Sequence, residues 1–369
     1  MKPKLVLVGG FLGSGKTTLL LKLGEQLVNE YGKKVAVVTN DQGEVLVDSA
    51  TVRDYGFEVA EVFKGCFCCN FQDFISQTQK ILEKLKPDII LAEPVGSCAG
   101  LMPTLYAPVK KFYSDRLELA PLIVIVDASR ILTLHQEVNL LNAEDPISFL
   151  IASQIKEGEV LCINKIDLVD SPTVAETVNL LKKLRPEAEY VLTSAKFNVG
   201  VDRIVEIVLK GVSKRLPYPD IDMIKYTQAE LELAWFDGLY ELKTKHGFNP
   251  RDFVRDVLSR IGRRITDLNG FIAHVKAYLR TKSGVFKANI TSIEQGATIT
   301  GSEDVNYTDY GMLLLNARVK LDPEELHKLV NSVVEEETLK RQIEVFKIKS
   351  EAFRPKPPKP QFYIPYSED

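Results

Sequence analysis

A glycine-rich segment near the amino terminus constrains the fold of this chain more than any other feature. Residues 10–18 read GFLGSGKTT and match the pattern G-x-x-x-x-G-K-[ST]. The segment follows an apolar run at 5–8 and precedes a stretch, 16–30, with apolar residues at helical spacing. A glycine-rich turn between a strand and a helix is the context in which this pattern binds phosphate. The sequence therefore predicts a P-loop fold, the alternative being a glycine-rich turn with an accidental lysine.

In such a loop the glycines let backbone N–H groups converge on the phosphates, and the following helix directs the positive end of its dipole at them. We expect Lys16 to reach the β- and γ-phosphates and Thr17 to ligate Mg²⁺. The residues predicted to bind the phosphates are Gly10, Gly13, Ser14, Gly15, Lys16, Thr17 and Thr18.

A second motif indicates guanine as the base. Asn164, Lys165 and Asp167 form an N-K-x-D pattern directly after an apolar run at 160–163. A carboxylate at Asp167 can accept hydrogen bonds from the N1–H and 2-amino groups of guanine, and adenine has no such pair of donors. A site built for those bonds rejects the analogue that lacks them. Residues 193–196 follow the next apolar run and suit a third loop around the base. The residues predicted on the base side are Asn164, Lys165, Asp167, Ser194, Ala195 and Lys196.

Acidic residues follow two further predicted strands. Glu93 comes after the apolar run at 88–92, where its carboxylate can approach the Mg²⁺ shell or position water. Asp41 and Glu44 follow the run at 35–39 and are candidates for water positioning, Mg²⁺ or a metal ligand. The predicted catalytic residues are Lys16, Glu93 and Asp41, and the predicted Mg²⁺ ligands are Thr17 and Glu93. A strand-ending turn and a solvated acidic loop are the alternatives without function.

Three of the five cysteines lie within four residues: Cys66, Cys68 and Cys69. A buried cysteine is usually a small apolar residue, but a cluster beside a glycine is not that pattern. Thiolates suit Zn²⁺, Cu⁺ or another soft to borderline ion, and three sulfurs leave a tetrahedral ion one ligand short, which suits transfer. Glu44 is the predicted fourth ligand. Redox chemistry and simple packing are the alternatives, and Cys98 is either a supplementary thiol or a structural residue.

Composition excludes several other classes. Lys+Arg number 47 and Asp+Glu 50, a net charge of −3, which argues against bulk binding of nucleic acid. No apolar run approaches the ~18 residues of a membrane helix, and the run at 5–8 is too short for a secretory signal. We therefore expect a cytoplasmic protein with no nucleic-acid or membrane partner.

The two halves of the chain differ in pattern. Residues 1–212 alternate apolar runs with helical segments, which predicts an α/β P-loop NTPase domain with a mainly parallel sheet. Pro217 and Pro219 mark a linker at 213–225. Residues 226–350 contain clustered strand-like stretches and two capped helices, beginning at Asn249 and Asp322, which predicts a smaller α+β domain. Residues 351–369 are predicted to be a proline-rich flexible tail.

Together these motifs resemble the CobW family of P-loop GTPases, which are relatives of the GTPases that deliver nickel to hydrogenase and urease. The resemblance covers roughly residues 4–210. It rests on six ordered motifs, at 9–18, 40–44, 65–69, 93–96, 126–127 and 164–167. It implies GTP binding, slow GTP hydrolysis, Mg²⁺, and Zn²⁺ or Co²⁺ at the cysteine motif. It also implies a metallochaperone role toward a client metalloprotein. Other GTPases of this broad class service cobalamin enzymes, so a corrinoid-related protein is another candidate partner, as is a second copy of the chain.

The resulting hypothesis links the two sites. GTP with Mg²⁺ is expected to order residues 40–48 and the loop after Glu93, and so to bring ligands toward the cysteines. Hydrolysis would then loosen the site and release the metal to a client selected by the C-terminal half. The alternative from another class is a GTP-dependent regulatory or redox-sensing protein whose cysteines form a reversible disulfide. An ATP-dependent kinase is disfavoured by the N-K-x-D motif.

Overall fold

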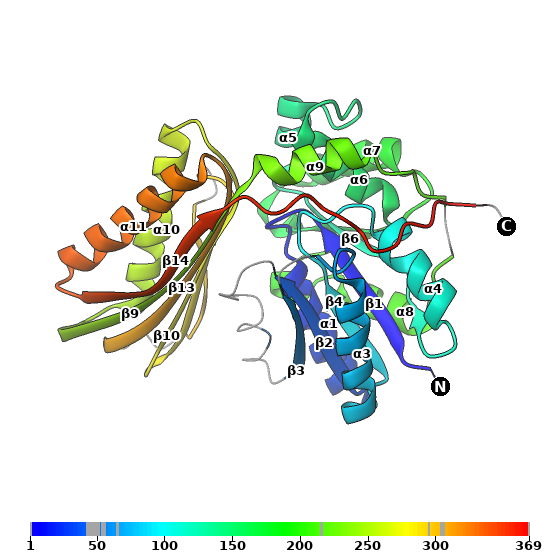
Figure 1. Cartoon of the computed structure of the whole chain (residues 1–369), viewed down its shortest axis with the longest axis horizontal. Helices are drawn as coiled ribbons and strands as arrows, with labels where there is room; N and C mark the ends of the chain where they lie inside the picture. Colours follow the sequence, from blue (N-terminus) through cyan, green and yellow to red (C-terminus); the bar gives the residue numbers. More distant parts are fainter. Residues whose placement is uncertain are drawn as a thin grey trace. The chain divides into compact units, whose positions relative to one another are not determined.

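The computed structural model describes residues 2–41, 52, 57–63, 66–214, 217–293, 296–302 and 307–367. These residues fall into two compact units (Figure 1). The first contains the described residues up to 229 together with 357–367, and the second contains 230–356. Within the described residues, no helix is both long and apolar enough to cross a membrane.

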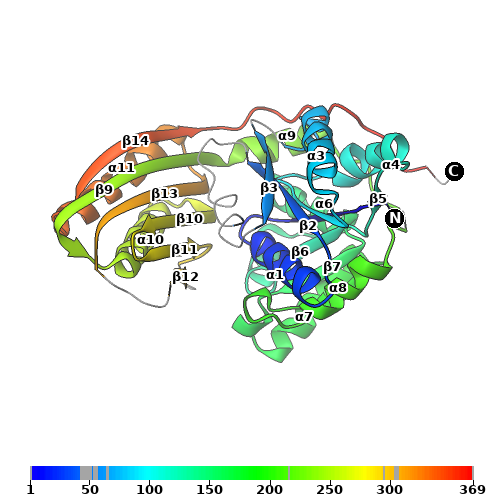
Figure 2. The same cartoon turned by 90° about the horizontal axis from the view of Figure 1, so that it is seen from below.

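The first unit is built on a parallel sheet with strand order β3-β2-β4-β1-β6-β7-β8, and β5 pairs with the other end of β1. Its strands are apolar on both faces, as in β1, where Leu5 to Val8 are fully buried, and helices accordingly cover both faces (Figure 2). The strands are β1 (Lys4–Gly10), β2 (Val35–Asp41), β3 (Glu58–Phe63), β4 (Ile89–Glu93), β5 (Glu118–Leu119), β6 (Ile123–Asp127), β7 (Val160–Asn164) and β8 (Glu189–Leu192).

Two helices of the first unit begin at an aspartate that caps them, α6 at Asp145 and α7 at Asp170. Asp145 caps α6 by accepting from the N–H groups of Ile147 and Ser148. A π-helical turn at Met102–Tyr106 leads directly into α4. The helices are α1 (Lys16–Asn29), α3 (Phe71–Leu85), α4 (Ala107–Tyr113), α5 (Ile131–Val138), α6 (Pro146–Glu157), α7 (Ser171–Leu184), α8 (Val201–Lys210) and α9 (Met223–Glu232).

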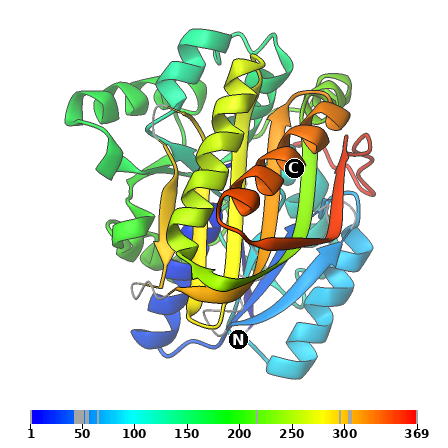
Figure 3. The ribbon, with the colours of Figure 1, turned by 90° about the vertical axis from the view of Figure 1, so that its left-hand side faces the viewer.

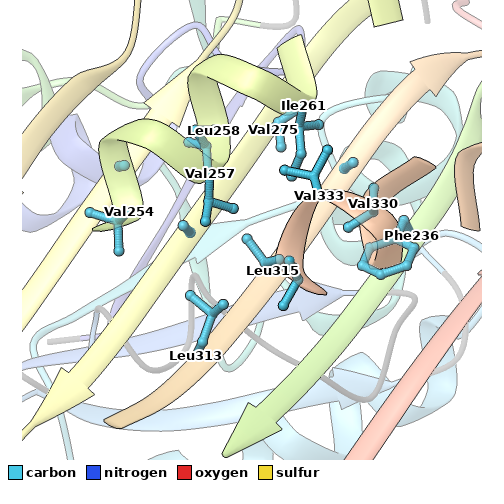
Figure 4. Close-up of a cluster of buried hydrophobic side chains, with 14 of the residues drawn as sticks. Phe236, Val254, Val257, Leu258, Ile261, Val275, Leu313, Leu315, Val330 and Val333 are labelled. Carbon is cyan, nitrogen blue, oxygen red and sulfur yellow. The ribbon is translucent and has the colours of Figure 1, made fainter. Parts of the chain in front are cut away.

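The second unit is an antiparallel sheet of order β12-β11-β10-β13-β9-β14. Two helices lie across one of its faces, yellow-green and orange in Figure 3. Alternate strand residues such as Phe236 and Leu315 meet Val257 and Val333 from the helices to form the core (Figure 4). The elements are β9 (Ala234–Phe248), α10 (Pro250–Asp267), β10 (Phe271–Thr281), β11 (Gly284–Ile290), β12 (Thr298–Gly301), β13 (Thr308–Lys320), α11 (Pro323–Lys340) and β14 (Glu344–Phe353).

The predicted fold class, a parallel α/β P-loop domain followed by a smaller α+β domain, is confirmed. Asn249 and Asp322 cap the two helices as expected, each accepting from two backbone N–H groups. Three of the described strands were not predicted: β3, β5 and β14. β5 has only two residues. The strands β3 and β14 lie at the edge of a sheet, and the β14 sequence EVFKIKSEAF mixes charged with apolar residues. Residues 351–353 of the predicted tail belong to β14, and residues 357–367 contact the first unit.

Candidate functional site

The glycine-rich loop runs from the end of β1 into α1 in a conformation that requires glycine. Gly10 and Gly15 have φ values of +126° and +105°. A Cβ on Gly10 would lie 2.3 Å from the carbonyl oxygen of Ile125 in β6, and one on Gly15 would lie 2.4 Å from Nδ2 of Asn164. The loop therefore lies directly against the backbone of β6 and against Asn164 at the end of β7. Helix α1 begins at Lys16.

Two polar pairs surround the start of α1. The Lys16 ammonium donates to the carbonyl of Phe11 at 3.3 Å, and the Thr17 hydroxyl donates to Oε1 of Glu93 at 2.9 Å. Glu93 is a buried carboxylate at the carboxyl end of β4. A Cβ on Gly96 would lie 2.7 Å from Lys16 Nζ. The loop after β4 therefore lies directly against the P-loop.

Asn164 joins three loops. Its Nδ2 donates to the carbonyl of Ser14 at 2.9 Å, and its Oδ1 accepts from the N–H of Ala195 at 2.9 Å and from Thr193 Oγ1 at 3.2 Å. Its side chain is buried. The amide thus fixes the base-side loops to the phosphate loop, a role that the sequence motif alone did not indicate.

The side chain of Asp167 is exposed beside that buried network. Its Oδ1 accepts from the Ser194 hydroxyl at 2.5 Å. Lys165 has a left-handed backbone, φ +64°, and its ammonium pairs with Asp127 at 2.6 Å. Asp127 ends β6 and was not singled out as a site residue from sequence, although its place at a strand end is the same signal that indicated Glu93. The exposed Lys196 ammonium lies over the ring of Phe197.

The cysteine cluster lies between β3 and α3. Cys66 and Cys68 are buried and Cys69 is half-buried. The Sγ atom of Cys66 lies 2.7 Å from that of Cys68 and 3.0 Å from that of Cys69. The Sγ atoms of Cys68 and Cys69 are 4.0 Å apart. Three sulfurs with mutual distances this short fit one ion after a small outward movement, since a tetrahedral Zn–S site has sulfur separations of about 3.8 Å.

Contact with Cys66 favours the protonated forms of Cys68 and Cys69. The neighbouring Cys66 thiol, together with burial, raises the pKa of Cys68 well above its usual range and that of Cys69 to about 12. A metal ion binding here would therefore have to displace protons.

A single side chain links the cysteine loop to the end of β2. Asn40 Nδ2 donates to the carbonyl of Val62 at 3.0 Å, and its Oδ1 accepts from the N–H of Phe67 at 2.9 Å. Asp41 follows Asn40 as the last residue of β2, but the side chain of Asp41 and the whole of Glu44 lie outside the described residues. The predicted roles of those two carboxylates remain predictions.

Gln154 of α6 holds the loop that follows Glu93. Its Nε2 donates to the carbonyls of Gly96 and Cys98, both at 2.9 Å. The Cys98 sulfur in turn lies 3.7 Å from that of Cys68. Sequence reasoning missed Gln154, because a glutamine inside a helix carries no pattern that marks a functional contact.

Comparison with known proteins places these features in a family. Residues 4–192 match the model described as "CobW/HypB/UreG, nucleotide-binding domain". Zinc-regulated GTPase metalloprotein activator 1 of Dictyostelium discoideum is 27% identical over 246 residues, covering 58% of this chain and 50% of that protein. The zinc chaperone CobW of Sinorhizobium sp is 30% identical over 184 residues, covering 44% of this chain and 51% of that protein. The chain thus spans about half the length of these curated relatives.

Among solved structures, HypB from Helicobacter pylori in complex with nickel is 19% identical with a TM-score of 0.41, covering 57% of this chain and 86% of that chain. At this level of similarity the fold rests on the strand order described above. The family model covers more than half of the chain and spans the glycine-rich loop, the cysteine cluster and the N-K-x-D motif. The chain therefore belongs to the CobW/HypB/UreG family.

Proposed function

We propose that this chain is a GTP-dependent metallochaperone that hydrolyses GTP slowly and carries a transition-metal ion on its cysteine cluster to a client protein. The observation that carries the proposal is the short path between two sites. Glu93 contacts Thr17 of the P-loop, and Cys98, on the loop that follows Glu93, contacts Cys68. Relatives named as zinc chaperones support Zn²⁺ as the cargo. Co²⁺ suits the same thiolates.

The nucleotide would be held by two loops. Backbone N–H groups of residues 10–18 and the Lys16 ammonium would bind the phosphates. The exposed carboxylate of Asp167, oriented by the Ser194 hydroxyl, would accept from the N1–H and 2-amino groups of guanine. Ala195 and Lys196 would border the base.

The side chains around Thr17 fit a magnesium ion, which would neutralise charge on the β- and γ-phosphate oxygens. Hydroxyl and carboxylate oxygens are the ligands that Mg²⁺ prefers, and those of Thr17 and Glu93 are 2.9 Å apart. During hydrolysis a water oxygen bonds to the γ-phosphorus as the bond to the β–γ bridging oxygen breaks, leaving GDP and phosphate. Lys16 would stabilise the charge that develops, and Glu93 and Asp41 would orient the water.

The cargo metal would be held by Cys66, Cys68 and Cys69. The sequence indicates Glu44 as the candidate for a fourth ligand. GTP would order residues 40–48 and the loop after Glu93, and hydrolysis would loosen both. The proposed client is a metalloprotein or a corrinoid-related protein, selected by the second unit, and a second copy of the chain is a further candidate partner.

One observation favours a second candidate function, redox sensing. The sulfurs of Cys66 and Cys68 are 2.7 Å apart, so loss of two electrons and two protons to an external thiol oxidant would join them in a disulfide. Such a disulfide would remove two metal ligands at once.

Metal titration separates the two functions. We expect reduced protein to bind one Co²⁺ ion per chain with a thiolate charge-transfer band that is lost in Cys68→Ser. Affinity should be higher with a non-hydrolysable GTP analogue than with GDP, and by linkage the metal should tighten binding of the analogue by the same factor. Equal Co²⁺ affinities in the presence of the GTP analogue and of GDP would mean that the chain has a metal site that the nucleotide does not control. Absence of the band in both nucleotide states would rule out the metallochaperone and leave the redox function.

A further inference from the structure

We propose that Cys98 is a fourth thiolate ligand of the cargo metal, supplied by the same loop that contacts the nucleotide site. The inference rests on the proposed function. It gives the metal site four sulfurs in place of three sulfurs and the carboxylate of Glu44, and it assigns the fourth ligand to a segment that GTP can move.

The sulfur positions carry the first step. Cys98 is 98 − 69 = 29 residues beyond the cluster in sequence, yet its Sγ lies 3.7 Å from Sγ of Cys68. That separation is close to the sulfur–sulfur edge of about 3.8 Å in a tetrahedral site with metal–sulfur bonds of about 2.3 Å. Cys66, Cys68 and Cys69 come from a single turn of chain, so a ligand from a second segment is what an ion needs to be enclosed.

Burial alone would not distinguish Cys98, because Cys162 is buried as well. The sulfur of Cys162 lies 3.0 Å from the Thr193 hydroxyl, within the core of the sheet. Cys98 instead directs its sulfur at another cysteine. Its backbone is fixed from two sides, since its N–H donates to the carbonyl of Val95 at 2.9 Å and its own carbonyl accepts from Gln154. Cys162 is therefore a matched control.

The same loop reaches the nucleotide site. Glu93 is hydrogen-bonded to Thr17, and Gly96 lies against the Lys16 ammonium. A change at either contact when the γ-phosphate arrives or leaves is transmitted along a few residues to the Cys98 sulfur. In the GTP state Cys98 completes a four-sulfur site. After hydrolysis the loop shifts, and the metal is left on three sulfurs, from which an acceptor can take it.

X-ray absorption of the Zn²⁺-loaded chain with a GTP analogue tests the ligand set directly. We expect four sulfurs around zinc in the natural chain and in Cys162→Ala, and three in Cys98→Ala. Zinc affinity in Cys98→Ala should fall by at least the roughly tenfold that loss of an outer-shell partner costs. The tightening by GTP over GDP should also shrink in Cys98→Ala and stay unchanged in Cys162→Ala.

The outcomes separate this inference from the proposed function. Three sulfurs in the natural chain, with an unchanged affinity in Cys98→Ala, would overturn the Cys98 assignment and leave the metallochaperone intact. A large loss in Glu44→Gln alone would assign the fourth position to the carboxylate. No sulfur-bound zinc in the natural chain would overturn both. The number of sulfur ligands around zinc in the natural chain tests the Cys98 assignment even if Cys98→Ala fails to fold.

A separate observation concerns the proline-rich carboxy-terminal segment. We infer that residues 359–364, the strap, cover the cysteine cluster and slow the exchange of its metal. The Lys359 N–H donates to Sγ of Cys69 at 3.2 Å, and the Gln361 N–H donates to the carbonyl of Cys68 at 3.0 Å. Backbone N–H groups donating to sulfur are the outer-shell contacts that stabilise metal-bound thiolates.

The strap is anchored beyond the sulfurs. Oε1 of Gln361 accepts from the N–H of Gln72 at 2.9 Å. The centroid of the Phe362 ring lies 5.0 Å from that of Phe71 and 5.4 Å from that of Phe112. The segment, red in Figure 2, runs past α3 and α4. Prolines at 357, 358 and 360 hold it extended, which lowers the entropy lost on docking.

Hydrogen exchange and metal transfer test the strap. The Ile364 N–H, which donates to the carbonyl of Pro103 at 2.9 Å, also anchors the strap. The amides of Lys359, Gln361 and Ile364 should exchange slowly in the metal-free natural chain and more slowly with Zn²⁺ bound. Transfer of Zn²⁺ to a chromogenic chelator should be roughly tenfold faster in Phe362→Ala and unchanged in Ser367→Ala. Fast exchange of these amides in the natural chain would overturn the strap whether or not metal binds. If the strap detaches in Phe362→Ala but Zn²⁺ transfer to the chelator is no faster, the strap does not slow the exchange of the metal.

Discussion

The side-chain amide of Asn164 donates to the backbone carbonyl of Ser14 at 2.9 Å, and this one bond ties the base-side motif to the phosphate loop. Its other end accepts from Ala195 and Thr193. A residue of the N-K-x-D motif therefore acts as a brace between loops, while Asp167 of the same motif lies on the exposed side.

Replacing Asn164 with alanine should destabilise the fold as well as weaken nucleotide binding. The change leaves the Ser14 carbonyl and the Ala195 N–H buried without this partner, at about 1–3 kcal/mol for each group. We expect the free energy of unfolding in urea to fall by roughly 2–4 kcal/mol. Lys196→Ala, on the exposed surface of the same loop, should change it by less than about 0.5 kcal/mol. Equal stability of the two variants would contradict the bracing role.

Asp167→Asn should change which base is preferred without changing the fold. The amide can donate to the 2-oxo group of xanthine, whereas it repels the 2-amino donor of guanine. We expect GTP affinity to fall by at least about 100-fold, and xanthosine triphosphate to become the better ligand. Competition binding measures both. Ser194→Ala removes only the hydroxyl that orients Asp167. The decrease in GTP affinity should therefore be smaller in this variant, and the base preference should be unchanged. Tight ATP binding by the natural chain would disprove the guanine assignment.

Local chemistry made some of these features predictable. The P-loop could be recognised because the positive φ at Gly10 and Gly15 admits almost no other residue, and the strand before it is continuously apolar. Thr17 and Glu93 could be expected in one place because the carboxyl ends of parallel strands share one edge of a sheet. The helices of the second unit followed from Asn249 and Asp322.

Other features depend on tertiary contacts that leave no periodic pattern. No residue of the edge strand β14 is fully buried, so its sequence does not alternate clearly between apolar and polar residues. The strap has no helix or strand periodicity, and its place is set by a few specific contacts such as Phe362 with Phe71. Gln154 looks like an ordinary polar residue in a helix until the Cys98 carbonyl is placed beside it.

Lys16→Ala should abolish hydrolysis while leaving the chain folded. The Lys16 ammonium donates to the loop carbonyl of Phe11 at 3.3 Å, whereas on a triphosphate it would face developing negative charge. Loss of such a preorganised donor typically costs about 100- to 1,000-fold in rate. Lys22→Ala, on the same helix but paired with Glu25, serves as the control and should keep full activity. Release of phosphate, followed with and without Mg²⁺, measures both, and an active Lys16→Ala protein would contradict the P-loop assignment.

The stability of the chain should depend on pH through Glu157. This carboxyl is buried in α6, where its Oε2 accepts from the N–H of Met102 at 3.1 Å, and burial raises its pKa to about 8 from an ordinary value of 4.5. Between those two values the folded chain binds one more proton than the unfolded chain. The free energy of unfolding should therefore decrease as pH rises from 4.5 to 8, by at most about 1.4 kcal/mol per pH unit, and the dependence should flatten on either side.

Glu157→Gln isolates this contribution, because glutamine keeps an oxygen that accepts from Met102 and cannot ionise. Urea unfolding at several pH values between 5 and 9 should show the natural chain losing stability relative to the variant as pH rises toward 8. Titrations of the other groups cancel in that difference. A difference that does not change with pH would mean that Glu157 is ionised in the folded chain. In that case the contact between α6 and the π-helical turn at Met102–Tyr106 would be held by a charge.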